Sequence, residues 1–428
     1  MAHTIIDFVT TVDAVKRPML DRALAGLSAS TDLLDGGPLG AIDTLHFASM
    51  TVFEDAGFDP LLVFECNCDG TLDEFLSRLL AAASAPLHEI LGCCTGYDVA
   101  SSSDAQGIGV FLRAHRVLPA AAYVGNVGRS CARIQSESDL HKELSAHIDD
   151  WQRESPVTTR RTLYERIVRD VRRRGHEWVF DGYETGARQA KAHAQRLIGT
   201  GAAIFVVALF LRVEALGVIA LIAALIVIVL RWHERHDASM DPADTSPSHF
   251  AALGRVEDHY RLNHLGSVTI VKDSRFRRVL LRAVLLVTRW AARLSTSGSL
   301  SGIPTIHFAH WALLDGGRRL LFLSNYDGSW GSYLDDFVDK ASQGLTAIWT
   351  NTVGFPPTRL LVRDGARDGA AFKAFARMRQ TPAAVWYQAA VYRNEGLTVH
   401  RINANSDLRI GIAAGAPAVD LAEWTRLW

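Results

Sequence analysis

Residues 45–53 read LHFASMTVF and residues 306–314 read IHFAHWALL, so one strand-like pattern occurs twice in the chain. The agreement continues downstream, where LLVFECNCDG at 61–70 corresponds to LLFLSNYDG at 320–328. Both stretches are rich in the β-branched and aromatic residues that favour strands. The repetition predicts one fold built twice, with the two copies packed against each other as a pseudo-dimer.

Matched residues that follow the second strand of the hairpin keep the same spacing in both copies. From Asp69 to Gly96 is 27 residues, and from Asp327 to Gly354 is also 27, with no gap required. The match covers about 6–150 and 266–415, and both tails contain the tripeptide Ser-Asp-Leu. The sequence therefore predicts a first repeat over 1–150, an insert over 151–265 and a second repeat over 266–428.

The hydrophobic periodicity predicts the order β-α-β-β-α-β in each copy, which is the ferredoxin-like unit of an α+β protein. In the first copy we expect strands at 5–12, 44–53, 61–67 and 88–94, and helices at 15–29 and 72–84. In the second copy we expect strands at 266–271, 305–314, 319–325 and 345–351, and helices at 275–294 and 330–341. Each copy then adds one further strand, within 120–126 and 383–392.

Composition excludes some classes of protein. The chain has 428 residues, 48% of them hydrophobic and 21% charged, which is typical of a globular protein. Its net charge of −1 gives no reason to expect nucleic acid as a partner. Cys66 and Cys68 are replaced by Ser324 and Tyr326 in the second copy, and their spacing is not that of a zinc site. We therefore predict reduced structural thiols and no metal site.

The insert contains a long apolar stretch. Residues 201–211 and 215–230 are almost purely apolar and are separated by Arg212-Val213-Glu214. The length of the second run approaches the roughly 17–25 residues that a helix needs to cross a bilayer, whereas the first run is shorter. The insert is therefore expected to be a membrane hairpin that either crosses the bilayer fully or is re-entrant. A pair of buried core helices is the alternative. A hairpin over about 199–231, flanked by basic residues, would keep both repeats on the cytoplasmic side, which a single crossing would not.

The expected helix at 275–294 is a second indication of a membrane. Arg278, Arg282, Arg289 and Arg293 fall on one side of it, and the remaining surface is Val, Leu, Ala and Trp290. Such a helix is typical of contact with an anionic lipid surface. A core helix with a solvated arginine face is the alternative interpretation.

Candidate functional residues concentrate in the second copy. Both copies contain a histidine in the sequence HFA, followed by an N-x-D-G sequence. The N-x-D-G sequence predicts either a turn before a helix or an aspartate that acts as a general acid or base at the mouth of a pocket. Strand alternation puts His307 and Trp311 on one face and His310 on the other. The predicted catalytic residues are Asp327, Asn325, His307 and Arg379, and the predicted cofactor-binding residues are His310, His400 and Trp311.

The duplicated pattern resembles the dimeric α+β barrel superfamily, which includes dye-decolorising peroxidases and chlorite-dismutase-like proteins. The peroxidases carry G-x-x-D-G, and SNYDG at 324–328 is similar, with Asp327 at the matching acid and Ser324 in place of the first glycine. The resemblance implies a haem cofactor, a peroxide-cleaving Asp and a proximal His, for which His310 and His400 are the candidates.

Two functional hypotheses follow. The first is a membrane-associated oxidoreductase, haem-dependent and peroxidase-like, that acts on a lipophilic substrate. The second is a non-catalytic membrane-tethered module that binds a lipid or another apolar small molecule.

Overall fold

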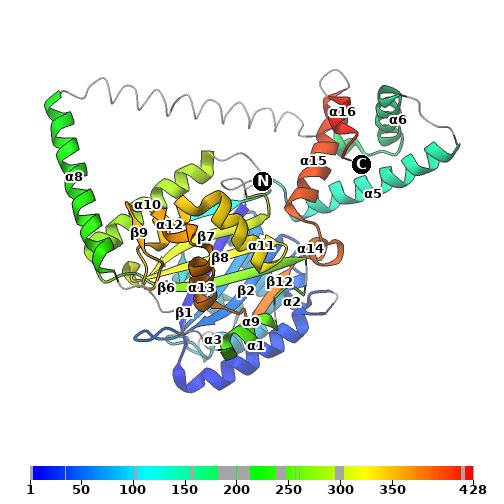
Figure 1. Ribbon diagram of the computed structural model, residues 1–428. Helices are drawn as coiled ribbons and strands as arrows, with labels where there is room; N and C mark the ends of the chain where they lie inside the picture. The colour runs from blue at the N-terminus through cyan, green and yellow to red at the C-terminus, as the bar shows by residue number, and fades with distance from the viewer. Residues whose placement is uncertain are drawn as a thin grey trace. The chain divides into compact units, whose positions relative to one another are not determined.

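The architecture is seen in a computed structural model of the chain (Figure 1). It describes residues 3–33, 35–100, 104–154, 159–181, 199, 213–237, 247–255, 257–259, 261–294, 303–415 and 420–427. The chain divides into two compact units. The first consists of Met1–Cys131 and Val227–Val399, and the second consists of Ala132–Ile226 and His400–Trp428.

The first unit contains two five-stranded antiparallel sheets with the same plan. The first sheet has the order β12-β2-β3-β1-β4, with strands Val385–Gln388, Leu45–Phe53, Leu61–Asp69, His3–Thr11 and Arg116–Val117. The second has the order β11-β6-β8-β7-β5, with strands Gln380–Thr381, Leu262–Ile270, Arg319–Asp327, Ile306–Leu314 and Ala121–Val124. The strands expected at 5–12, 44–53 and 61–67 in the first copy, and at 266–271, 305–314 and 319–325 in the second, are thereby confirmed.

The two halves of the sequence exchange one strand each. β12 comes from the second half but pairs with β2, through the register Val385↔Met50 to Gln388↔Phe47. β5 comes from the first half but pairs with β7, through Ala121↔Trp311 to Val124↔Phe308. Each exchanged strand covers the edge that its partner sheet would otherwise leave open, so neither half completes its own sheet.

The two sheets pack against each other through apolar side chains. One buried cluster combines Phe53, Leu61 and Val63 of the first sheet with residues of the second, namely Val268, Ala312, Leu314, Leu321 and Leu323. Every residue of β2, β3 and β8 is buried. Both faces of these strands are therefore covered, which explains why their sequences run apolar with little alternation.

Helices cover the outer faces of the sheets. In Figure 1, α1 lies on one side of the strands and α10 and α12 lie on the other. The helices from the first half are α1 (Arg17–Thr31), α2 (Gly37–Gly40), α3 (Leu72–Leu91) and α4 (Ala105–Ala114). Those from the second half are α9 (Pro247–Gly254), α10 (Arg275–Leu294), α11 (Trp330–Asp336), the π-helix η5 (Phe337–Ala341), α12 (Ser342–Trp349), α13 (Gly369–Arg379) and α14 (Ala390–Glu395). A two-stranded ribbon, β9 (Thr358–Arg359) with β10 (Arg363–Asp364), lies beyond α12 in the chain.

The strands predicted at 88–94 and 345–351 are wrong. α3 runs on to Leu91, and α12 contains most of the second segment. Both copies kink at an equivalent alanine and then continue as helix: Ala83 has φ −131° and ψ 16°, and Ala341 has φ −126° and ψ 8°. Pro86 follows the first kink and occupies the first turn after it, where proline is tolerated, so it does not end the helix. Short apolar runs do not distinguish strand from helix.

The second unit is helical. It contains the main part of α5 (Cys131–Glu154), then α6 (Arg160–Arg173), nearly all of α15 (Val399–Ala414), and α16 (Leu421–Trp424). Leu140 and Leu408, the leucines of the two Ser-Asp-Leu tripeptides, are buried in one cluster with Tyr164, Ile167 and Trp424. The tails of the two repeats therefore meet in one core, which is separate from the sheets.

One helix in the described part of the chain is long and apolar enough to cross a membrane. It is α8 (Val213–His236), over the span Gly217–His236. The first apolar run, 201–211, and thus the first arm of the expected hairpin, lies outside the described residues. The expected helix at 275–294 is confirmed as α10.

The contact between the sheets gives a stability prediction. Leu323 is fully buried in the cluster between them, so Leu323→Ala should lower the free energy of unfolding of the first unit by about 2–5 kcal/mol. Urea unfolding followed by tryptophan fluorescence measures the change. Leu118→Ala, at a leucine that is 66% exposed, should alter it by less than about 0.5 kcal/mol. Equal effects of the two substitutions would contradict this packing.

Candidate functional site

The histidine that the two copies share sits at a β-bulge in each sheet. The pairing of β2 with β3 shifts between Leu45 and Phe47, and the pairing of β7 with β8 shifts between Ile306 and Phe308. His46 and His307 are therefore the extra residues. Bulges redirect a side chain and occur often beside functional sites.

The bulge overturns the predicted arrangement of the second-copy strand. The ring of His307 contacts Phe47 of the other sheet, with centroids 5.4 Å apart. Trp311 instead packs with Phe322 and Trp349, at 4.9 Å and 6.1 Å, in the core beneath the helices. His307 and Trp311 do not share a face, because the bulge shifts the alternation of the strand by one residue.

In the second copy, the shared histidine and aspartate form a closed pair. His307 Nε2 lies 2.7 Å from Asp327 Oδ1, at the end of β8. Asp327 Oδ2 accepts a hydrogen bond of 2.8 Å from the backbone N–H of Val399, the first residue of α15. Both carboxylate oxygens are thus engaged, one by the imidazole and one by the helix N-terminus, where a negative charge is favoured.

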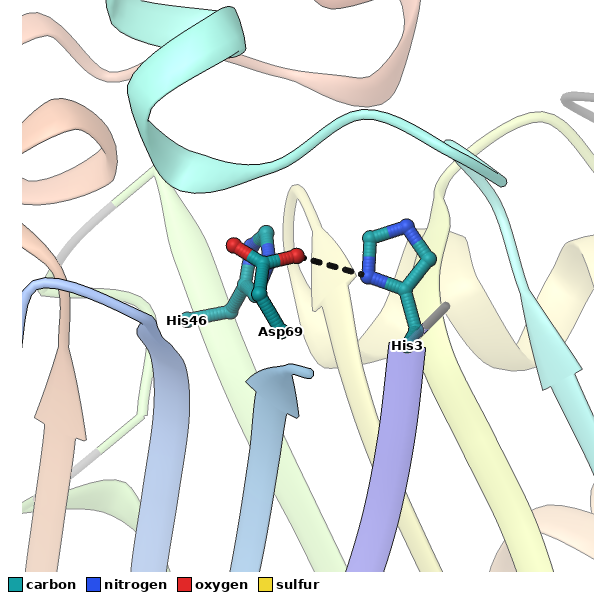
Figure 2. A group of neighbouring side chains, drawn as sticks. All are labelled: His3, His46 and Asp69. Atoms are coloured by element: carbon teal, nitrogen blue, oxygen red, sulfur yellow. Dashed lines mark ion pairs between the residues drawn. The ribbon is translucent and has the colours of Figure 1, made fainter. Parts of the chain in front are cut away.

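In the first copy, two histidines approach the corresponding aspartate (Figure 2). Asp69 Oδ1 lies 3.1 Å from His46 Nε2 and 3.3 Å from His3 Nδ1. Asp69 Oδ2 accepts a hydrogen bond of 2.9 Å from the N–H of Cys131, the first residue of α5. Burial alone would raise the pKa of Asp69, but the two imidazoles and this amide outweigh it and hold the pKa well below its usual range.

Tyr392 of α14 connects the two pairs. Its hydroxyl lies 2.6 Å from His46 Nδ1, and its ring stacks on Phe47 with centroids 4.6 Å apart. The same ring meets His307 edge-on at 5.3 Å. The equivalent histidines of the two copies therefore lie around one buried tyrosine, which is in the segment that follows the exchanged strand β12.

A buried polar network lies between the sheets, and Glu65 is its centre. The Glu65 carboxylate accepts hydrogen bonds from Ser49 Oγ at 2.9 Å, Asn67 Nδ2 at 2.8 Å and Asn325 Nδ2 at 3.2 Å. His264 Nε2 of the second sheet lies 3.0 Å from Glu65 Oε2, the oxygen that also accepts from Ser49. The first sheet supplies the acid and the second sheet supplies the imidazole, so the network ties one sheet to the other.

A second acid–histidine contact crosses the same interface. His310 Nε2 lies 3.0 Å and 2.9 Å from the two oxygens of Asp7, and both residues are fully buried. Burial raises the pKa of Asp7. Burial also acts to lower the pKa of His310, but the adjacent Asp7 carboxylate outweighs this and raises it. The pair therefore retains its shared proton to a higher pH than either group would in water.

The predicted site residues are only partly brought together. His307 and Asp327 are in contact, and Asn325 joins the network of Glu65, where Asn325 Oδ1 also accepts from Trp386 Nε1 at 3.2 Å. Arg379 is half-buried at the end of α13 and donates to the carbonyl of Val353 at 3.4 Å. His310 and Trp311 lie on opposite sides of β7, in the contacts given above. His400 is exposed on α15 and belongs to the second unit.

Sequence reasoning missed several residues of this region, namely His3, Asp7, Glu65, His264 and Tyr392. Asp7 and Glu65 carried a usable signal, because a single charge inside an apolar strand must be paired when the strand is buried. His3 carried none, since its partner Asp69 is 66 positions away in the sequence. Within the described residues, His3, His46 and Asp69 form a group that could hold a metal ion, and the cysteine spacings did not point to it.

Comparison with known protein-family models gives no match, and a search of curated proteins finds no sequence relative.

Glu65 gives a prediction on acid stability. Burial alone would raise the pKa of Glu65, but His264, His310 and Asn67 lower it from 4.5 to about 2. A lowered folded-state pKa stabilises the protein above the unfolded-state value, and this stabilisation is lost as the pH falls from about 4.5 to about 2. Glu65→Gln should cost roughly 3–5 kcal/mol at pH 7 and weaken the pH dependence in that interval.

Denaturant unfolding at a series of pH values measures both effects. Glu54→Gln is the matched control, because Glu54 is exposed and its pair with Arg17 lies at the surface. It should change the stability by less than about 1 kcal/mol at any pH. If the loss of stability between about pH 4.5 and pH 2 were the same in Glu65→Gln as in the wild type, Glu65 would not be its source.

Proposed function

We propose that this chain is a membrane-associated binding protein, in which α8 enters the bilayer and the two-sheet unit is a non-catalytic module at the membrane surface. The observation that carries the proposal is the exposure of α8. Over the span Gly217–His236, 6% of the helix is buried. The apolar side chains from Val218 to Ile228 that face solvent are between 43% and 72% exposed, and a helix that is apolar all round requires lipid or protein around it.

The carboxyl end of α8 is fixed to the first unit, as a tether requires. Glu234 accepts hydrogen bonds from the N–H groups of Leu360 and Leu361, at 3.1 Å and 2.8 Å. His233 stacks on Phe276 of α10, with centroids 5.3 Å apart and planes 1° from parallel. These contacts hold the end of the apolar helix beside the start of α10.

α10 supports the same proposal through its outer face. Val279, Leu286, Val287 and Trp290 are all more than half exposed, whereas Leu281 and Leu285 are buried against the sheet. Arg282 and Arg289 are also exposed, beside this apolar stripe. Arginines flanking exposed leucine and tryptophan fit an anionic lipid headgroup layer better than water.

We infer that each half of the first unit is a ferredoxin-like unit, and that the two together are of the dimeric α+β barrel type. Support comes from the matching strand orders β2-β3-β1-β4 and β7-β8-β6-β11. Further support comes from the helices α1 and α10, each between the first two strands of its half, and from α3 and α11, each after the hairpin. The membrane hairpin, with both repeats on the cytoplasmic side, is also part of the proposal.

The competing proposal, a haem-dependent peroxidase-like oxidoreductase, is less well supported by the site. A haem ligand needs a free imidazole nitrogen facing a cavity, but His310 is fully buried and its Nε2 is held by Asp7. Both oxygens of Asp327 are engaged by His307 and Val399, so this acid is not free to assist peroxide cleavage. His310 and Asp327 therefore do not fit the roles assigned to them in a haem site, and we favour the binding module.

The tether is tested by charge insertion in α8. Ile222→Arg with Leu225→Arg should release the full-length protein from membranes, because arginine at the centre of a span costs about 2.5–3.5 kcal/mol. Carbonate extraction of membranes from expressing cells, followed by immunoblotting, measures the released fraction. Val110→Arg with Leu118→Arg, at two exposed apolar residues elsewhere, should remain in the pellet with the wild type. Release of the wild type itself by carbonate would refute the tether.

The choice between module and peroxidase is tested by absorbance. The full-length protein, purified in detergent from haem-replete cells, should show no Soret band. A Soret band that disappears in His310→Ala or His400→Ala would overturn the non-catalytic proposal and favour the peroxidase.

A further inference from the structure

We propose that His3, His46 and Asp69 bind one divalent transition-metal ion of the zinc class, in the first copy alone. The atoms concerned are His3 Nδ1, His46 Nε2 and Asp69 Oδ1, which all lie within 4.8 Å of one another. The three side chains are 5%, 1% and 2% exposed. They come from three adjacent strands, since β3 lies between β1 and β2.

The distances from the carboxylate oxygen to the two imidazole nitrogens fit ligands that share one ion. Two ligand atoms at roughly 2.0–2.2 Å from an ion, with an angle of about 90–110° between them, lie roughly 2.8–3.6 Å apart. Asp69 Oδ1 is 3.1 Å from His46 Nε2 and 3.3 Å from His3 Nδ1. Among the described residues, none of these three buried atoms has a hydrogen-bond partner of acceptable geometry. Three buried polar atoms that face one another without hydrogen-bond partners destabilise the fold unless a cation binds between them.

The remaining polar atom of each ligand is already held. Asp69 Oδ2 accepts from the N–H of Cys131, and His46 Nδ1 lies 2.6 Å from the hydroxyl of Tyr392. His3 Nε2 lies 3.1 Å from the carbonyl oxygen of Asn126 and 3.0 Å from the backbone N–H of Gly128, which can donate to it. When Nδ1 binds the ion, Nε2 carries the proton and donates to Asn126, and the hydrogen bond from Gly128 is given up. Such outer contacts orient ligands in metal sites.

The second copy provides an internal comparison. His307 Nε2 and Asp327 Oδ1 are 2.7 Å apart and form a direct hydrogen bond. The register pairs His3 with Asp69, and it pairs Leu262 with Asp327. The second copy therefore has a leucine where the first has the second imidazole, and its pair is closed. Only the first copy has the three ligands and the open geometry.

The donor set indicates the class of ion. Two imidazole nitrogens and one carboxylate oxygen suit Zn²⁺, Co²⁺ or Fe²⁺ and do not suit Ca²⁺ or Mg²⁺, which prefer oxygen ligands. Three protein ligands leave a fourth position for water or a small anion, as in zinc sites that are not closed by four side chains. The proposal does not depend on the membrane tether, because none of the three ligands lies on α8.

The experiment is metal binding by the full-length protein. After treatment with a chelator and dialysis, the wild type should take up one Zn²⁺ per chain, measured by mass spectrometry of the metal and by competition with a chromophoric chelator. His3→Leu introduces the leucine that the second copy has at the equivalent position, and it should bind Zn²⁺ at least about tenfold more weakly than the wild type does. His400→Leu, at an exposed histidine, should bind as the wild type does. Uptake below one equivalent by the wild type, or equal affinity of His3→Leu and the wild type, would overturn the proposal.

Co²⁺ substitution in the wild type keeps the test independent of how the variants fold. Nitrogen and oxygen ligands should give visible d–d bands without a sulfur-to-cobalt charge-transfer band in the near ultraviolet. A strong charge-transfer band would place the ion on the cysteines and refute the assignment to His3, His46 and Asp69.

Discussion

The exchange of edge strands is the constraint on which the rest of the first unit depends. β5 and β12 each complete the sheet of the other half, so the open edges and the inner apolar faces are covered only when both halves are present. The exchange also places Tyr392, which follows β12, against His46 of the other half. The repeat is therefore one folding unit, whose parts are joined by backbone hydrogen bonds as well as by side-chain packing.

The two copies have diverged in their polar residues more than in their backbone. The shared elements are the bulged histidine, the aspartate at the end of the hairpin and the helix N-terminus that this aspartate holds. In the interface between the sheets, the first copy supplies the acids Asp7 and Glu65, and the second supplies His264 and His310. Complementary charges of this kind favour pairing of unlike halves, because two acidic sheets facing each other would be destabilised.

The chain combines a buried polar network between the sheets with exposed apolar surfaces on α8 and α10. Many polar groups between the sheets hydrogen-bond to one another, and the facing atoms of His3, His46 and Asp69 lack such partners, whereas α8 and the outer face of α10 expose apolar side chains next to arginines. The proposed lipid contact uses the exposed surfaces of α8 and α10, and the proposed metal ion uses the buried polar interior. His3, His46 and Asp69 could bind an ion whether or not α8 enters a membrane, since none of them lies on α8.

The sequence by itself determined the duplication, most strands and helices, the apolar helix α8 and the amphipathic helix α10, because these depend on local periodicity and on comparison of one copy with the other. Tertiary structure alone decided the partners. The bulges at His46 and His307 reverse the predicted side-chain alternation, and the residues expected as strand at 88–94 continue a kinked helix. His3 joins His46 and Asp69 only because β1 and β2 both flank β3. Pairing between distant strands is set by burial and register across the whole sheet, and no local pattern encodes it.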